Sequence, residues 1–222
     1  MSPEIAEGLL AWIILCISIA LHEYGHARAA DRLGDPTPRL QGRVTLNPLA
    51  HLDVIGTGVI PLLNIMIPIF TGVSIPVMFG WGKPVMINPL NIEPKKRVRF
   101  DLLATAAGPA MNVVLIAVGA LLLGVAVPFA PMLGTLVIQL LLINASLVVF
   151  NLMPLPPLDG SHFLKHALKL SDEFMMRMSF YSLFIMLFLI NFAPFRALMH
   201  TLILGLLTPF LWVSDLLQRL VA

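Results

Sequence analysis

Long apolar runs that carry almost no charge limit what this chain can fold into. A helix needs roughly 20 apolar residues to cross the hydrocarbon core of a bilayer, which is about 30 Å thick. Because lipid satisfies no backbone polar group, such runs must form helices. Candidate segments cover residues 9–30, 54–73, 102–127, 133–153, 178–192 and 197–213. The runs predict an all-α polytopic membrane protein with about five to six transmembrane helices.

The composition supports a membrane rather than a soluble protein. Hydrophobic residues make up 58% of the chain and charged residues 12%, whereas a soluble domain has about 25% charged residues. A chain of 222 residues has too much surface to hide that much apolar sequence in a core. The net charge of +2 is too small to indicate nucleic-acid binding, and the one cysteine excludes an internal disulfide.

The basic residues predict how the segments are arranged. Lysines and arginines cluster after the first apolar run, before the third and after the fourth. Since basic residues mark the cytoplasmic side, these three clusters belong on one face of the membrane. That is possible only if residues 54–90 make no net crossing. We therefore expect re-entrant or extended elements between the first and third hydrophobic segments.

The first apolar run contains the sequence HEYGH at residues 22–26. Residues four apart on a helix share a face, so His22 and His26 can direct two imidazoles at one ion. A catalytic zinc site keeps one position for water, and Glu23 would be its general base. Ionisable groups inside a bilayer cost at least about 2.5–3.5 kcal/mol and are usually functional. A purely structural His-Glu network between helices is the alternative.

Two histidines leave a zinc ion one protein ligand short, and Asp159 is the candidate for the third. It follows an apolar run in NLMPLPPLDG, residues 151–160, where the prolines must unwind the helix. The unwound chain can direct a carboxylate back into the bundle. An aspartate that caps the helix over 161–169 is an equally good interpretation of the spacing. Most other acids lie in polar or terminal stretches and are expected to be solvated.

Three motifs together resemble the site-2 protease family of intramembrane metalloproteases. They are HEYGH in the first run, AAGPAMN at 106–112 and NLMPLPPLDG at 151–160, in the order of the family. GRVTLNPLAHLDVIGT at 42–57 and FGWGKPVMINP at 79–89 are similar to the compact subgroup that lacks a PDZ domain. The resemblance covers roughly residues 20–165.

The resemblance implies a role for each matching residue. His22, His26 and Asp159 are expected to bind one Zn²⁺ per chain, and Glu23 to be the base. Asn151 matches the family asparagine that holds substrate or stabilises the oxyanion. Supporting roles near the site are expected for Asn112 and His51. For Asn144 a polar contact between helices is the simpler interpretation, and His162 and His166 are expected to be interfacial residues.

The implied function is intramembrane zinc-dependent hydrolysis of peptide bonds in or near transmembrane segments. We expect one membrane domain over residues 1–222, with a catalytic core at about 8–165 and a helical hairpin at about 176–214. The expected partners are a transmembrane protein substrate and the bilayer of a prokaryotic plasma membrane, with the active site toward the cytoplasm. A membrane metal transporter that uses the same cluster is the alternative. No repeat of the kind common in transporters is evident.

Overall fold

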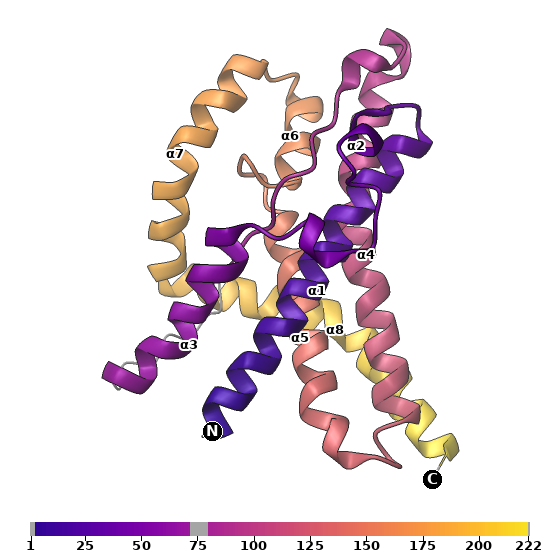
Figure 1. The fold of residues 1–222 in the computed structure, drawn as a ribbon, viewed down its shortest axis with the longest axis vertical. Coiled ribbons are helices and arrows are strands. Elements are labelled where there is room, and N and C mark those ends of the chain that lie inside the picture. The colour runs from indigo at the N-terminus through magenta and orange to yellow at the C-terminus, as the bar shows by residue number, and fades with distance from the viewer. Residues whose placement is uncertain (1–2, 72–79, 222) are drawn as a thin grey trace.

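The structure is a computed structural model that describes residues 3–71 and 80–221 (Figure 1). Its helices are α1 (Pro3–Arg32), α2 (Thr37–Leu40), α3 (Ile60–Thr71), α4 (Arg97–Val125), α5 (Gly134–Asn151), α6 (Gly160–Leu168), α7 (Asp172–Asn191) and α8 (Ala193–Val221). Short helical turns occupy Pro48–Ala50, Val54–Val59, Pro89–Asn91, Pro94–Lys96 and Pro131–Leu133. Within the described ranges there is no strand, which confirms the predicted all-α fold.

Four of the described helices, α1, α4, α5 and α8, are long and apolar enough to cross a membrane. The two parts of α7 meet at a bend of 50° and would make a fifth span if they cross together. The described residues thus hold four candidate spans, or five if α7 crosses as one, where five to six were expected. Our division into a catalytic core and a C-terminal hairpin stays a prediction.

The bundle is built around α4, which packs along α1, α5 and α8. Small residues let α1 and α4 approach closely, as is typical of membrane helices. A Cβ atom on Gly25 of α1 would lie only 2.5 Å from the carbonyl oxygen of Ala107 on α4. The close packing at this level brings the histidine-bearing face of α1 against α4.

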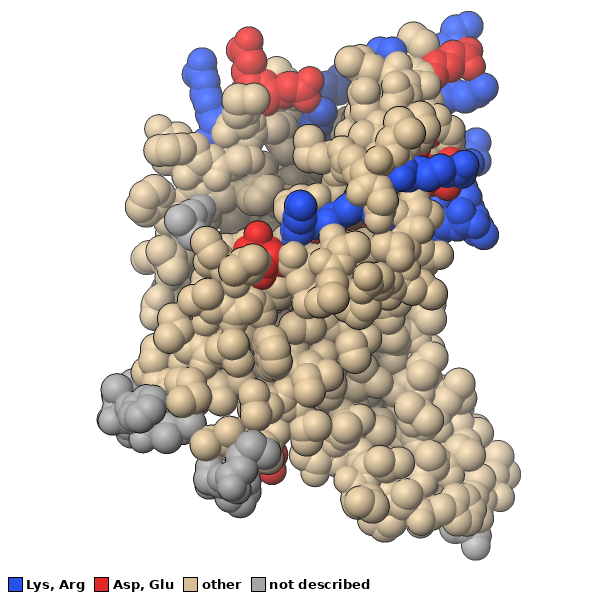
Figure 2. Space-filling model, in the orientation of Figure 1, with Lys and Arg blue, Asp and Glu red and all other residues tan. Residues whose placement is uncertain are grey.

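The outer surface is divided between charge and apolar side chains (Figure 2). In that view the lysines, arginines and most visible acids gather at the end of the molecule that carries α2 and α6, and the remainder is almost uncharged. Large apolar side chains such as Ile13, Val114 and Trp212 are exposed along the helices. Exposed apolar surface of this extent indicates contact with lipid. The chain is therefore a multi-pass membrane protein.

The chain between α1 and α4 leaves the bundle near Gly56 and returns to the same place at Trp81. The helical turn Val54–Val59 leads into α3, and the chain comes back with the Trp81 amide 3.2 Å from the carbonyl oxygen of Gly56. Leu52 and Gly82 form an isolated antiparallel bridge beside this contact. The excursion thus begins and ends at one level, as the expected re-entrant arrangement requires. Residues 72–79, part of the expected extended return, lie outside the described residues.

Asp35 fastens the extended chain that follows this excursion. Its fully buried carboxylate accepts hydrogen bonds from the Asn88 amide at 2.7 Å, from Asn91 Nδ2 at 2.7 Å and from Thr37 Oγ1 at 2.6 Å. Burial raises the pKa of this carboxyl, but the hydrogen bonds outweigh burial and hold the pKa below its usual value. Our expectation that such acids are solvated was therefore wrong for Asp35, because its partners come from a distant segment.

Candidate metal centre

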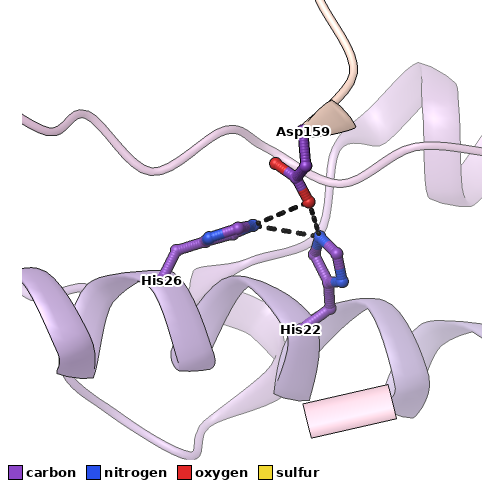
Figure 3. A group of neighbouring side chains, drawn as sticks. All are labelled: His22, His26 and Asp159. Carbon is purple, nitrogen blue, oxygen red and sulfur yellow. Dashed lines mark hydrogen bonds and ion pairs between the residues drawn. The ribbon is translucent and has the colours of Figure 1, made fainter. Parts of the chain in front are cut away.

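Three side chains predicted as metal ligands meet at one point (Figure 3). His22 and His26 are one turn apart on α1, and their Nε2 atoms are 3.0 Å from each other. Asp159 Oδ2 lies 3.3 Å from His22 Nε2 and 3.4 Å from His26 Nε2. The candidate ligand atoms of this trio all lie within 4.8 Å of one another. Both histidines are buried.

The hydrogen bonds around the trio leave lone pairs facing its centre. His26 Nδ1 lies 2.8 Å from the carbonyl oxygen of Ala104, which can only accept, so the ring proton is on Nδ1. His22 Nδ1 lies 2.6 Å from Asn112 Oδ1 and makes the corresponding bond. Asp159 Oδ2 is buried and has no hydrogen-bond partner among the described residues. Two imidazole Nε2 atoms and a carboxylate oxygen thus converge while both Nδ1 atoms are bound elsewhere, a donor set that fits a zinc ion.

The absence of a side chain at Gly108 makes room for this arrangement. A Cβ atom at Gly108 of α4 would overlap the Nε2 atom of His26 and lie 2.8 Å from that of His22. The AAGPAMN motif thus supplies the surface against which both rings pack, and Asn112, four residues later, contacts His22 from the same helix. Asn112 thus lies beside the candidate ligands, and its role stays a prediction.

Asp159 reaches the histidines because the chain unwinds between α5 and α6. After α5 ends at Asn151, the proline-rich stretch turns back, and Asp159 directly precedes α6. Gly160 packs against the backbone of Leu152 so closely that a Cβ atom would overlap it. The Asp159 side chain makes no capping hydrogen bond to α6. Of the two interpretations left open by the spacing, the structure thus favours a carboxylate directed into the bundle.

A second cluster holds α6 in place, and sequence reasoning missed it. Asp101 of α4 lies with Oδ2 3.0 Å from His162 Nδ1 and 2.6 Å from His166 Nε2. His162 and His166 were expected to be merely interfacial and Asp101 to be solvated, but these side chains bind one another. Because α6 directly follows Asp159, the cluster also fixes the segment that carries the third candidate ligand. The spacing of four between the two histidines was the available signal.

Glu23 lies next to His22 but is not one of the converging ligands. Its Oε2 accepts a hydrogen bond from the backbone amide of Val85 at 3.0 Å. Val85 belongs to the extended chain, which is fastened at one side by the Lys83 amide bond to the His51 carbonyl, 2.8 Å, and at the other by Asp35. Glu23 thus follows His22 on α1 and stays outside the trio, and its role as general base stays a prediction.

Two further predicted site residues, Asn151 and His51, also lie outside the trio. Asn151 Nδ2 donates to the carbonyl oxygen of Leu147 on its own helix, 2.9 Å away. His51 is fully buried, and its Nε2 donates to the carbonyl oxygen of Thr45 at 2.9 Å. In this arrangement His51 supports the extended chain rather than the ligands. The roles expected for Asn151 and His51 near substrate stay predictions.

Comparisons with known proteins agree with this geometry. Residues 129–192, which include Asn151 and Asp159, match the family model described as Peptidase family M50. The protein named "Putative zinc metalloprotease YwhC" of Bacillus subtilis is 35% identical over 157 residues, which cover 67% of this chain and 64% of that protein. The protein named "Putative zinc metalloprotease Rip2" of Mycolicibacterium smegmatis is 32% identical over 178 residues, covering 70% of this chain and 63% of the relative.

A Mycobacterium tuberculosis protein with the same printed name, Rip2, is 29% identical over 162 residues, covering 72% of this chain and 58% of its own. The matched part of the chain thus spans less than two thirds of the length of these relatives. No solved structure matches the chain. The family match includes one proposed zinc ligand, and the relatives cover most of the chain. On these grounds the chain carries a peptidase family M50 (site-2 protease) domain and is homologous to these putative zinc metalloproteases.

Proposed function

We propose that this chain is a zinc metalloprotease that hydrolyses peptide bonds in or near the transmembrane segments of membrane proteins. The observation that carries the proposal is the convergence of His22, His26 and Asp159 with their lone pairs inward, beside a carboxylate that is not a ligand. Three protein ligands leave a fourth position open, which distinguishes a catalytic zinc site from a structural one. Glu23 is the spare carboxylate that hydrolysis needs.

His22, His26 and Asp159 would hold the zinc ion, one per chain. When bound, zinc supplies Lewis-acid chemistry, since it lowers the pKa of a water toward about 7 and polarises a carbonyl oxygen. Glu23 then accepts a proton from the attacking water and returns it to the leaving amine as the peptide bond breaks. Asn151, at the end of α5, would hold the substrate or stabilise the oxyanion.

The substrate must present an unwound peptide, because the carbonyl groups of an intact helix are occupied by hydrogen bonds. We propose that the chain at residues 41–47 and 80–88, outside the helical turns, offers a strand edge to this peptide. The Val85 amide, 3.0 Å from Glu23, places part of this chain directly beside the site. Substrate that pairs with this edge would reach the ligands without crossing the bundle.

The active site is proposed to lie toward the cytoplasm. The ligands come from the later turns of α1 and from the connection between α5 and α6. The end of the molecule where α2 and α6 lie also carries the gathered lysines and arginines (Figure 2). Since basic residues favour the cytoplasmic side, both features support this orientation in a bacterial plasma membrane.

Metal removal tests the proposal. The purified protein, reconstituted with a model transmembrane substrate, is expected to cleave it, to stop when a chelator removes the metal, and to recover with one equivalent of zinc. Product fragments are measured by gel and mass spectrometry. Zinc transport into liposomes by a protein that cleaves no substrate would instead support the transporter alternative and overturn the protease. Ligands that converge on one point, rather than along a path, favour the protease.

The amide of Val85 is expected to orient Glu23 during catalysis. Val85→Pro removes this N–H, whereas Val85→Ala keeps it and is the matched control. A hydrogen bond to a charged group is worth about 1.5–3 kcal/mol, so Val85→Pro should lower kcat about 10–100-fold, and Val85→Ala should have little effect. Zinc content should be unchanged in both variants. Equal losses in the two variants would assign the effect to the side chain instead.

A further inference from the structure

Three fully buried polar side chains from three helices are joined by hydrogen bonds that end at His22. They are Ser18 of α1, Asn112 of α4 and Asn144 of α5. Asn112 Oδ1 lies 2.6 Å from His22 Nδ1, and Asn112 Nδ2 lies 2.9 Å from Asn144 Oδ1. Asn144 Nδ2 lies 3.0 Å from Ser18 Oγ and 2.9 Å from the carbonyl oxygen of Leu140.

The carbonyl oxygen of Leu140 determines which end of each asparagine amide donates and which accepts in these hydrogen bonds. The Leu140 oxygen can only accept, so Asn144 must turn Nδ2 toward it and Oδ1 toward Asn112. Asn112 must then present Nδ2 to Asn144, which leaves its Oδ1 for His22. Because that oxygen also only accepts, His22 carries its proton on Nδ1 and keeps a lone pair on Nε2. The Ser18 carbonyl, 3.4 Å from Asn112 Nδ2, favours the same orientation.

We propose that Asn144 is a positioning residue, which acts through Asn112 to fix the tautomer of His22 that leaves Nε2 free to bind the metal. The inference rests on the proposed zinc centre. The other histidine, His26, needs no such help, because the carbonyl of Ala104 fixes its tautomer directly. Partners of this kind on metal-binding histidines typically fix the ring orientation as well.

The two ends of the Asn112 amide have nearly the same size, so its orientation depends on its neighbours. Without the acceptor on Asn144, only the longer 3.4 Å contact with the Ser18 carbonyl opposes a turn of the amide that presents Nδ2 to His22 Nδ1. That arrangement favours a proton on Nε2, where it competes with the metal for the same lone pair. Our simpler interpretation, a polar contact between helices, explains only stability and predicts no effect on the tautomer.

A double-mutant cycle separates these two roles. Asn144→Leu removes the acceptor at similar volume and is expected to weaken zinc binding about 10–100-fold, measured on the full chain in detergent by competition with a chromophoric chelator. In an Asn112→Asp background both oxygens of the carboxylate accept hydrogen bonds. Turning the group over would therefore still present an acceptor to His22 Nδ1. There Asn144→Leu should leave zinc affinity unchanged. Equal losses in both backgrounds, or no loss in either, would overturn the proposal.

Gln139→Leu is the matched control, since it removes another amide from α5. The Gln139 Oε1 atom is buried and has no hydrogen-bond partner within the part of the chain that the structure describes. Its substitution should leave zinc affinity unchanged. A comparable loss for Gln139→Leu would mean that zinc affinity reports on the packing of α5, and the assignment to Asn144 would fall.

Nitrogen NMR of the histidines in the metal-free wild-type protein tests the same idea without a variant. We expect a protonated Nδ1 on His22, and a shift toward protonated Nε2 in Asn144→Leu. Protonated Nε2 in the wild type would overturn the proposal. If the wild type binds no zinc, the proposed function fails and the NMR result still decides the role of Asn144. If the wild type binds zinc and Asn144→Leu binds it equally, only the positioning role fails.

Discussion

Glu23→Gln is expected to abolish cleavage while the protein keeps its zinc. Glutamine has the shape of glutamate, and its oxygen can still accept from the Val85 amide, so the surroundings should be undisturbed. What it lacks is the ability to take up a proton from water. Loss of a general base typically costs about 10²–10⁴-fold in rate. Because Glu23 is outside the converging trio, zinc content by atomic spectroscopy should stay at one per chain.

Glu7→Gln provides the control for this experiment. Glu7 is an exposed carboxylate on the same helix, four turns before Glu23. Its substitution removes the same charge from α1 and should leave both cleavage and zinc content unchanged. Full cleavage by Glu23→Gln would remove Glu23 from the mechanism. Simultaneous loss of zinc would make it a ligand rather than a base.

Gly108→Ala is expected to remove zinc from the protein with a single added methyl group. The new Cβ would overlap His26 Nε2 and press against His22 Nε2 at 2.8 Å. Neither ring can retreat easily, because the carbonyl of Ala104 holds one and Asn112 holds the other. The ligand geometry must therefore break, and cleavage should fall with the zinc content. Both are measured on the same purified sample.

Gly205→Ala separates this steric effect from helix propensity. Alanine is favoured over glycine inside a helix by about 0.8–1.0 kcal/mol, so both substitutions carry the same intrinsic gain. A Cβ atom at Gly205 of α8 meets no atom within 4 Å. Zinc content and cleavage should therefore match the wild type. Normal zinc binding by Gly108→Ala would show that the rings pack differently from the arrangement described above.

Much of this site could be predicted from sequence because its information is local. The spacing of four puts His22 and His26 on one face, and the resemblance of NLMPLPPLDG to the family motif identified Asp159 as the candidate for the third ligand. The distribution of basic residues indicated the re-entrant excursion, because charge is expensive to move across lipid. Helical spacing, a short motif and the placement of basic residues were sufficient for these three predictions.

The remaining contacts depend on which helices become neighbours, and spacing does not contain that information. Asn144 and Asn151 are seven residues apart on one helix, yet Asn144 bonds to α4, whereas Asn151 bonds to the carbonyl of Leu147 on its own helix. Asp101 meets His162 across 61 positions of sequence. The burial of Asp35 likewise depends on a segment more than fifty residues away. A helical period identifies a face but not the helix that covers it.

The backbone contact between Gly56 and Trp81 affects which insertions and deletions this chain can tolerate. The two ends of the excursion are joined there. A change in the length of the segment between them therefore need not shift α1 relative to α4 and α5. Insertions and deletions between these residues would alter the size of the excursion and leave the spacing of the metal ligands intact. Because Ile65 of α3 packs against Gly8 of α1, this tolerance applies to changes in length that leave α3 against the histidine helix.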